Sequence, residues 1–340
     1  MWYKPSMPET IKKPLGFKYS KTKSLIRYRW KDGEWDSGEL MGEDTLNISY
    51  AATVLHYGQS AFEGLKAFKW KDESIRVFRP EENAKRMQLS CDRLMMPKVP
   101  EDMFLDAVQR VVKDNAEYVP NPEDGALYIR PFIFGSGETI GISPSSEYEF
   151  VVLVIPVGDY YKANTNGVKA VIWEDFDRAA PFGTGHVKAA GNYAADLYPS
   201  QKAKASGFDV VLYLDAKTRT YIEEFGTSNF VAIHKEGVYV TPESPTILAS
   251  ITNQTLIDIA RSLGVDVQRR KVKLEELSGF EEIGACGTAV VITPVGQIDY
   301  AGKTLWSHTG SKEVLHKIKL TYQQIQRGEV EDTFGWMFKV

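Results

Sequence analysis

Hydrophobic residues recur at helical spacing in two stretches of the first half of the chain. In the first stretch they come three or four positions apart, which places them on one face of a helix; they are Ala84, Met87, Cys91 and Leu94. Residues 79–82, just before them, contain a proline and two glutamates, which are typical of a first helical turn. A second helix is predicted at about residues 101–117, with Leu105, Val108 and Val112 on one side.

Short runs rich in β-branched and aromatic residues predict strands along the whole chain. In the first half, hairpins are expected at residues 25–45 and 59–78, followed by strongly apolar strands at 126–134 and 149–156. In the second half, strands are expected at 168–173, 209–214, 228–234, 238–241 and 289–293. Two further helices are predicted, one capped by Asn192 and running to about residue 205 with a kink at Pro199, and one from Thr252 to Leu263 that ends at Gly264.

The order of these elements predicts a mixed α/β (α+β) fold in two domains. Neither half shows internal repeats or a regular strand–helix–strand alternation, which argues against a doubly wound nucleotide-binding fold. Residues 157–167 are polar and interrupted by glycines, as a domain linker is. We therefore expect a small N-terminal α/β domain at 1–156, a linker at 157–167 and a larger C-terminal α/β domain at 168–340. A chain of 340 residues is long enough for two cores.

Composition narrows the class of protein without indicating a reaction. The chain is 43% hydrophobic with a net charge of −4, so it has no general attraction for nucleic acid or an anionic membrane. It contains no stretch of about 18 apolar residues, and its first residues do not resemble a signal peptide. Its two cysteines, Cys91 and Cys286, indicate neither a disulfide framework nor a metal site. These features predict a soluble cytoplasmic protein without a bound metal.

Two separated segments indicate a possible chemistry. Lys188 lies among the small residues of 183–191, which leave room for a flat molecule against the backbone, and Glu224 precedes a Gly–Thr turn. Such a pair can hold pyridoxal phosphate (PLP) at both ends of its ring, because the amine forms a Schiff base and the acid keeps the pyridine nitrogen protonated. Taken singly, a surface lysine and a strand-end acid are the commoner explanations. If strand alternation holds, only one of Glu223 and Glu224 faces inward.

Other polar residues could bind phosphate or carboxylate groups. Arg86 could hold a phosphate, although an arginine on a helix surface is the more common case. The helix start at 250–253 offers backbone amides that form either an anion site or an ordinary N-cap. Residues 284–289 are expected to form a loop whose Thr288 could grip an anion. Tyr128 and Arg130 share one face of a strand, where they either decorate an edge or point at a substrate carboxylate.

Seven ordered blocks of sequence resemble the branched-chain amino-acid aminotransferases, which are PLP enzymes of fold type IV. The blocks are HYGQSAFEGLKAF at 56–68, FRP at 78–80, LYIRP at 127–131, RAAP at 178–181, KAAGNY at 188–193, EFGTSN at 224–229 and GTA at 287–289. The AFEGLK and YIRP blocks separate the chain from the D-amino-acid aminotransferases and aminodeoxychorismate lyases of the same fold. The resemblance runs from about residue 15 to residue 340, and it implies two α/β domains with the coenzyme at their interface.

The resemblance implies a role for each matching residue. Lys188 is the implied catalytic residue, which forms the Schiff base and moves the proton between the substrate Cα and the coenzyme. The implied coenzyme-binding residues besides Lys188 are Glu224 at the pyridine nitrogen, Tyr193 at the ring hydroxyl, Arg86, Ile251, Thr252 and Thr288 at the phosphate, and Thr227. The implied substrate-binding residues are Tyr57, Phe62, Tyr128, Arg130, Ile142, Thr288 and Ala289.

Within that implied pocket, Tyr128 and the amides of Thr288 and Ala289 hold the α-carboxylate, and Arg130 receives the distal carboxylate of glutamate. Ile142 is implied to come from the partner subunit of a homodimer. The implied reaction moves an amino group between L-leucine, L-isoleucine or L-valine and 2-oxoglutarate in a ping-pong cycle. Its products are branched-chain 2-oxo acids and L-glutamate, and the resemblance implies no metal.

The chain departs from the family pattern at a few positions. Val231 stands where an aromatic residue is expected, and Asn253 stands where a basic residue is expected. Val290 and Thr293 replace the redox cysteine pair of some relatives, so that switch is not expected. Two alternatives stay open: a lyase or D-amino-acid aminotransferase of the same fold, and a PLP-binding protein that has lost catalysis.

Overall fold

The chain forms two compact units in a computed structural model that describes residues 15–158, 167–308, 310 and 313–340. The first unit consists of the described residues within 1–160 together with Lys188–Ala190 and Ile325–Val340. The second consists of the described residues within 161–187 together with Gly191–Gln324. The expected domain limits stay a prediction, and most of the expected linker lies outside the described residues.

The first unit is built on an antiparallel sheet. Among the described residues it has nine strands, in the order β19-β6-β5-β7-β8-β1-β2, with β3 paired to β1 and β4 paired to β7. The strands are β1 (Leu25–Lys31), β2 (Glu34–Trp35), β3 (Glu39–Met41), β4 (Ser60–Phe62), β5 (Leu65–Lys69), β6 (Ile75–Phe78), β7 (Ala126–Gly135), β8 (Tyr148–Val157) and β19 (Met337–Lys339). The central pair β7–β8 runs in unbroken register from Ala126↔Val157 to Gly135↔Tyr148, which fits the two strongly apolar runs seen in the sequence.

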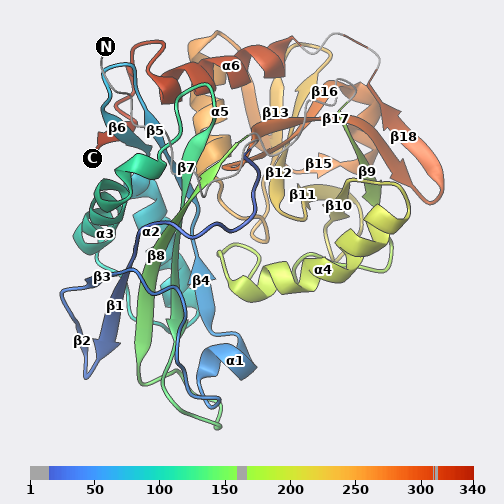
Figure 1. Ribbon diagram of the computed structural model, residues 1–340. Coiled ribbons are helices and arrows are strands. Elements are labelled where there is room, and N and C mark those ends of the chain that lie inside the picture. The colour runs from blue at the N-terminus through green and yellow to red at the C-terminus, as the bar shows by residue number, and fades with distance from the viewer. Residues whose placement is uncertain (1–14, 159–166, 309, 311–312) are drawn as a thin grey trace. The chain divides into compact units, whose positions relative to one another are not determined.

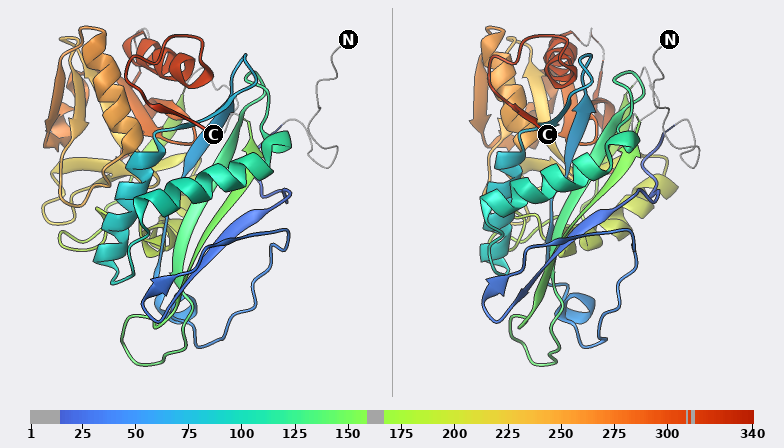
Figure 2. Two further views of the ribbon diagram at one scale, coloured as in Figure 1. Left: turned by 90° about the vertical axis from the view of Figure 1, so that its left-hand side faces the viewer. Right: turned by 60° about the vertical axis from the view of Figure 1, so that its left-hand side comes forward.

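Helices cover one face of this sheet. They are α2 (Pro80–Arg93) and α3 (Glu101–Asp114), and Figure 2 shows them lying together across the strands; a short α1 (Thr53–Tyr57) and the 3₁₀ turn η1 (Ala116–Tyr118) complete the unit. The helical spacing predicted from the sequence is confirmed for α2, because Ala84, Met87 and Cys91 are buried in the core. In α3 the buried apolar residue of the first turn is Phe104 rather than the predicted Leu105.

The second unit contains a mixed sheet whose strands close on themselves. Its hydrogen-bonded path runs β12-β16-β17-β9-β10-β11, and β11 pairs again with β12, so six strands make a closed ring among the described residues. The strands of the whole sheet are β9 (Val168–Ile172), β10 (Val210–Leu214), β11 (Tyr221–Phe225), β12 (Ser228–His234), β13 (Tyr239–Pro242), β14 (Val267–Arg270), β15 (Val272–Lys273), β16 (Phe280–Gly287), β17 (Val291–Tyr300) and β18 (Lys303–Ser307). Closure removes strand edges and gives inward side chains one shared core.

Three helices lie around the second sheet, as Figure 1 shows. They are α4 (Ala190–Ala205), α5 (Ile251–Ser262) and α6 (Val314–Arg327), with a 3₁₀ turn η2 (Leu274–Gly279). The predicted end of α5 at Gly264 is confirmed, because that glycine has the left-handed φ of 77°. Among the described residues, no helix combines the length and apolar character that crossing a membrane requires.

The expectation of a mixed α/β architecture is confirmed, and several element boundaries are wrong. Residues 284–287 were expected in a loop but continue strand β16, so only 288–290 form the turn. The following strand begins at Val291 rather than at residue 289. Asn192 lies inside the first turn of α4 rather than before it, and from there its Nδ2 donates hydrogen bonds to the carbonyls of Thr184 and Val187.

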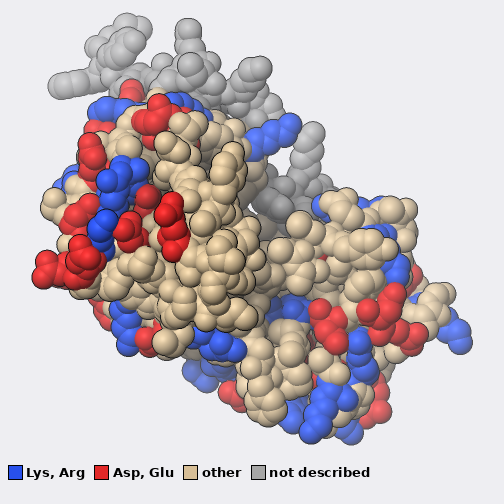
Figure 3. All heavy atoms as spheres, turned by 90° about the horizontal axis from the view of Figure 1, so that it is seen from below, with Lys and Arg blue, Asp and Glu red and all other residues tan. Residues whose placement is uncertain are grey.

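The surface charge is mixed. On the face drawn in Figure 3, acidic and basic side chains are interspersed.

Candidate active site

Lys188 belongs to a short segment that joins the sheet of the first unit. Its carbonyl accepts a hydrogen bond from Phe62 N at 3.2 Å, and its own N–H donates to Ser90 Oγ at 3.0 Å. The next residue, Ala189, forms a β-bridge with Ala61. The lysine side chain is half-buried, and its Nζ lies 4.5 Å from the centre of the Phe62 ring. The backbone of this segment therefore fixes the root of the amine beside an aromatic face.

Tyr128 and Arg130 lie next to each other on β7, and the prediction that they share a face is confirmed. Arg130 Nη2 donates to Tyr128 Oη at 2.8 Å, and the guanidinium carbon lies 4.7 Å from the centre of the Phe62 ring. Arg130 Nε is buried without a hydrogen-bond partner among the described residues. An unsatisfied buried donor costs free energy, so this side chain suits an acceptor that a ligand brings.

Arg86 is paired with a carboxylate that the sequence analysis did not consider. Its Nε and Nη2 donate to Oε1 and Oε2 of Glu63, each at 2.7 Å, and Glu63 is fully buried. Asn83 Nδ2 also donates to Glu63 Oε2, at 2.7 Å. A guanidinium has five N–H donors, so this bidentate pair fixes the orientation of Arg86 without excluding a phosphate. Ser90 Oγ donates to the Arg86 carbonyl, which links α2 to the Lys188 segment.

Glu224 lies at the end of β11 in the second unit, where three donors hold its carboxylate. Arg178 Nη2 lies 2.6 Å from Oε1, the Leu248 amide donates to the same oxygen at 3.0 Å, and Asn229 Nδ2 donates to Oε2 at 3.0 Å. The side chain of Glu224 is 4% exposed. Charge-assisted hydrogen bonds of this kind favour the ionised carboxylate and fix its direction.

Glu223 contradicts the expectation that only one of the two adjacent acids faces inward. Both are 3% exposed. The Glu223 carboxylate accepts hydrogen bonds from Ser244 Oγ at 2.8 Å and from Thr246 Oγ1. The two carboxylates point to opposite faces of β11, where they meet different partners, so the side chains do alternate. Both faces of β11 are buried, and both acids are therefore internal.

The turn after Glu224 packs against helix α4. A Cβ placed on Gly226 would come within 2.5 Å of both carboxylate oxygens of Asp196. Asp196 is buried and accepts hydrogen bonds from Tyr213 Oη at 2.5 Å and Ser200 Oγ at 2.7 Å. Tyr193, three residues before Asp196, lies on the same helix and is half-buried. The predicted coenzyme residue Thr227 is exposed in this turn.

The two other predicted anion-binding segments also lie in the second unit. Ser250 is the N-cap of α5 and its Oγ accepts from Asn253 N at 3.1 Å, so Ile251 and Thr252 form the first turn of that helix. Thr288 and Ala289 lie in the turn between β16 and β17, and both are half-buried. Val291, just after the turn, has a φ of 68°, which is strained for a β-branched residue.

Tyr57 and Ile142 take part in none of the contacts of the Lys188 segment given above. Tyr57 ends α1 and donates its hydroxyl to the Ile140 carbonyl at 2.5 Å. Ile142 is 96% exposed in the β7–β8 loop. The structure therefore joins Tyr57 to this loop by a hydrogen bond, while Ile142 in the same loop is exposed.

Four residues emerge from the structure that the sequence analysis did not assign to the site: Glu63, Ser90, Arg178 and Asn229. Glu63, Arg178 and Asn229 stand inside blocks that carry the family resemblance. The signal that could have found Glu63 and Arg178 is a charged residue within an otherwise apolar or small-residue block, since a buried charge requires a partner of opposite sign. The sequence does not show which partner each takes, because Arg86 lies 23 positions from Glu63 and Glu224 lies 46 positions from Arg178.

Comparisons with known proteins identify the family. The model of the family described as "Amino-transferase class IV" matches residues 60–298. The chain is 43% identical over 339 residues to the branched-chain-amino-acid aminotransferase of Helicobacter pylori, covering 99% of each chain. It is 45% identical over 335 residues to that of Haemophilus influenzae, covering 96% of this chain and 97% of the relative.

Solved structures agree with these relatives. The branched-chain amino acid aminotransferase of Escherichia coli superposes with a TM-score of 0.76 at 27% identity, covering 92% of this chain and 98% of the other. That of the archaeon Thermoproteus uzoniensis, solved with norvaline, has a TM-score of 0.75 at 28% identity and covers 92% of this chain and 98% of the other. The fold type IV expectation is confirmed. With relatives of this identity and coverage, the chain belongs to the branched-chain-amino-acid aminotransferases of the class IV aminotransferase family.

Proposed function

We propose that this protein transfers an amino group between L-leucine, L-isoleucine or L-valine and 2-oxoglutarate, with pyridoxal phosphate as its coenzyme. The observation that carries the proposal is the environment of Arg130. Its guanidinium lies beside the rings of Phe62 and Tyr128, and its buried Nε has no hydrogen-bond partner among the described residues. Aromatic faces suit an aliphatic side chain, whereas a guanidinium suits the distal carboxylate of glutamate. One pocket can therefore accept both partners of the reaction.

Each unit contributes residues whose chemistry fits the coenzyme. Pyridoxal phosphate, when bound, supplies an aldehyde open to attack by an amine and a ring that withdraws electrons from the substrate Cα. Lys188 offers the amine, and its Nζ is the group that would take and return the Cα proton. Glu224 offers an oriented carboxylate, held by Arg178 and Asn229, for a protonated ring nitrogen.

Anion-binding groups are proposed for the phosphate and the substrate carboxylate. The first turn of α5 presents the amides of Ile251 and Thr252, where the helix dipole also favours negative charge. Arg86, oriented by Glu63, adds a fork of donors. Thr288 is proposed to contribute at the phosphate, and together with Ala289 and Tyr128 it would hold the α-carboxylate. Tyr193 is proposed for the ring hydroxyl and Thr227 for the same coenzyme.

A homodimer and a cytoplasmic location are part of this proposal. Ile142 is 96% exposed and Ile140 is 74% exposed in one loop, and Tyr50 near α1 is 96% exposed. Large apolar residues exposed together favour a protein interface, and Ile142 is proposed to complete the pocket of the partner subunit. Sedimentation analysis of the purified protein measures its oligomeric state, and fractionation of cells measures its location.

The decisive experiment compares turnover of L-leucine and D-alanine, each with 2-oxoglutarate. We expect L-leucine to be used and D-alanine to be used poorly or not at all. The variant Lys188→Ala should lose nearly all turnover, because the amine makes the covalent attachment and moves the proton. Lys204→Ala, an exposed lysine on α4, is the matched control and should retain full activity.

Three results would contradict this proposal. Exclusive use of the D-substrate would indicate a D-amino-acid aminotransferase of the same fold. A yellow protein whose visible spectrum does not change on addition of L-leucine would indicate a coenzyme-binding protein without catalysis. Substantial turnover by Lys188→Ala would remove that lysine from its proposed role.

A further inference from the structure

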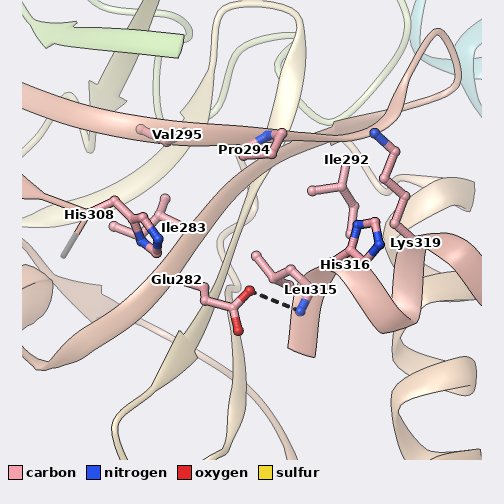
Figure 4. Close-up of a pocket in the computed structure, with 9 residues that line it drawn as sticks. All are labelled: Glu282, Ile283, Ile292, Pro294, Val295, His308, Leu315, His316 and Lys319. Atoms are coloured by element: carbon pink, nitrogen blue, oxygen red, sulfur yellow. Dashed lines mark hydrogen bonds between the residues drawn. The ribbon is translucent and has the colours of Figure 1, made fainter. Parts of the chain in front are cut away.

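A cavity of about 100 Å³ lies in the second unit, between helix α6 and strands β16 and β17. Figure 4 shows the side chains that surround it, which come from these three elements and from His308, just after β18. None of the residues drawn there has a role in the function proposed above. The cavity therefore needs an explanation of its own.

The floor of the cavity is aliphatic. Ile283, Ile292, Val295 and Leu315 are each at most 5% exposed. A dry aliphatic cavity of comparable size, about 150 Å³, binds small apolar molecules. A volume of 100 Å³ suits a side chain of a few carbons whose head group stays at the opening.

One side of the cavity carries hydrogen-bond acceptors. Glu282 is 5% exposed, and its two oxygens accept the Val314 and Leu315 amides at 2.9 and 3.1 Å. Each carboxylate oxygen has a second lone pair, and burial raises the pKa of Glu282, so a bound cation would offset its desolvation. His308 Nδ1 lies 3.1 Å from the Glu281 carbonyl and must donate to it, which leaves Nε2 as an acceptor in the neutral ring.

The opposite side carries hydrogen-bond donors. His316 and Lys319 project from α6, and Figure 4 shows them on the far side of the cavity from His308. An imidazole donates an N–H in either protonation state, and an ammonium donates three. Acceptors and donors thus face each other across an aliphatic floor. A zwitterion with a short apolar side chain has the complementary arrangement.

We propose that this cavity is a second, non-catalytic binding site for a small aliphatic α-amino acid. The ammonium group would face Glu282 and His308, the carboxylate would face His316 and Lys319, and the side chain would lie against the aliphatic floor. Strands β16 and β17 also lead to the turn that carries Thr288. A bound amino acid would therefore stiffen the β16–β17 hairpin, whose turn carries the residues proposed to hold the phosphate and the substrate carboxylate.

The test counts bound molecules of α-methyl-L-leucine per chain by equilibrium dialysis. This probe has no Cα–H, so an aminotransferase cannot turn it over. We expect one molecule fewer per chain in His316→Glu than in the wild type, because the new carboxylate repels that of the ligand. His316 is exposed, so this variant is expected to fold. Lys317→Glu, the exposed neighbour on α6, is the matched control and should bind as the wild type does.

The difference between wild type and variant is independent of the catalytic site. Failure of the proposed function would lower the count in both proteins equally and leave the difference at one. Equal counts in the wild type and His316→Glu would overturn the second site. A second ligand, isopentylamine, lacks the carboxylate. We expect it to bind the second site at least about tenfold more weakly than α-methyl-L-leucine, which corresponds to the loss of one charge-assisted hydrogen bond. A smaller difference in affinity would also overturn the second site.

Discussion

Arg130 is the residue on which we expect substrate choice to depend. Its guanidinium lies near two aromatic rings and donates to Tyr128 Oη, while its Nε has no partner among the described residues. An arginine held by ring faces can turn toward a carboxylate or remain against the rings when the substrate is aliphatic. Its contribution should therefore differ between the two kinds of substrate.

For Arg130→Met, which keeps the chain length without the cation, we expect a selective loss. The kcat/KM for 2-oxoglutarate should fall roughly ten- to hundredfold, the effect of losing a charge-assisted hydrogen bond of about 1.5–3 kcal/mol. The kcat/KM for 4-methyl-2-oxopentanoate should change much less. Arg130→Lys should recover part of the loss, because it restores a cation without the fork. Equal losses for both oxo acids would assign Arg130 a structural role.

At the residue scale, the sequence indicates which groups we propose as reactive, but it does not indicate their partners. Lys188 and Glu224 stand out because small residues and a turn surround them. The partners Glu63 of Arg86 and Arg178 of Glu224 come from distant positions. Breaking a buried ion pair of this kind costs about 3–5 kcal/mol, so these partners matter as much to the fold as the groups they hold.

The β11–β12 turn shows how an element positions Glu224, the proposed partner of the coenzyme nitrogen. Gly226 approaches Asp196 so closely that a Cβ there would lie 2.5 Å from its carboxylate oxygens. Asp196 is itself fixed by Tyr213 and Ser200. The turn that follows Glu224 is thus held against α4, the helix that carries Tyr193.

We expect Gly226→Ala to destabilise the fold by roughly 1–3 kcal/mol, the usual cost of forcing extra volume into a packed site, and to weaken coenzyme binding. Gly191→Ala is the matched control for stability only, because a Cβ there meets nothing within 4 Å and alanine favours the helix by about 0.5–1 kcal/mol. It is not a control for coenzyme binding, since Gly191 belongs to the small residues proposed to leave room for the coenzyme. Urea unfolding midpoints and coenzyme titrations measure both effects. A Gly226→Ala midpoint equal to that of Gly191→Ala would show that the turn is not held by Asp196.

At the element scale, helix α2 followed directly from periodicity, and strands β7 and β8 followed from their strongly apolar, β-rich runs. Strand β16 did not, because Gly284, Ala285 and Gly287 have low strand propensity. Their pairing with β12 and β17 nevertheless makes them a central strand. Here the neighbouring strands decide the structure, and Gly284 fits because a Cβ there would come within 2.6 Å of Ile292 on β17 and 3.3 Å of Val231 on β12.

The stability of the whole molecule should depend on the ionisation of Glu149, a half-buried acid. Glu149 on β8 lies 3.9 Å from Arg27 Nε, and its Oε2 has no hydrogen-bond partner among the described residues. Burial raises the pKa of Glu149 above its ordinary value of 4.5, despite Arg27 and Arg29. The folded state therefore holds this proton more tightly than the unfolded state, and the stability from this group falls as pH rises above about 4.5.

We expect the urea midpoint of Glu149→Gln to gain on that of the wild type as pH rises from 4.5 toward 7, because the variant cannot ionise. Asp72→Asn gives the opposite sign at lower pH, since hydrogen bonds from Ser74 lower the pKa of Asp72 below its ordinary value of 3.8 and its contribution to stability is lost as pH falls below about 3.8. Parallel pH curves for wild type and Glu149→Gln would show that this acid does not penalise the native state.

At the scale of the whole molecule, the sequence by itself determined the fold class and the family, and it predicts which side chains are chemically active. These follow from local spacing and from ordered blocks, which are properties of neighbouring residues. Tertiary structure alone decided the ring of strands in which β9 pairs with β17, the partners of Arg86 and Glu224, and the cavity beneath α6. Each of these joins residues far apart in the chain, and such contacts form only when side-chain packing repays the entropy of closing long loops.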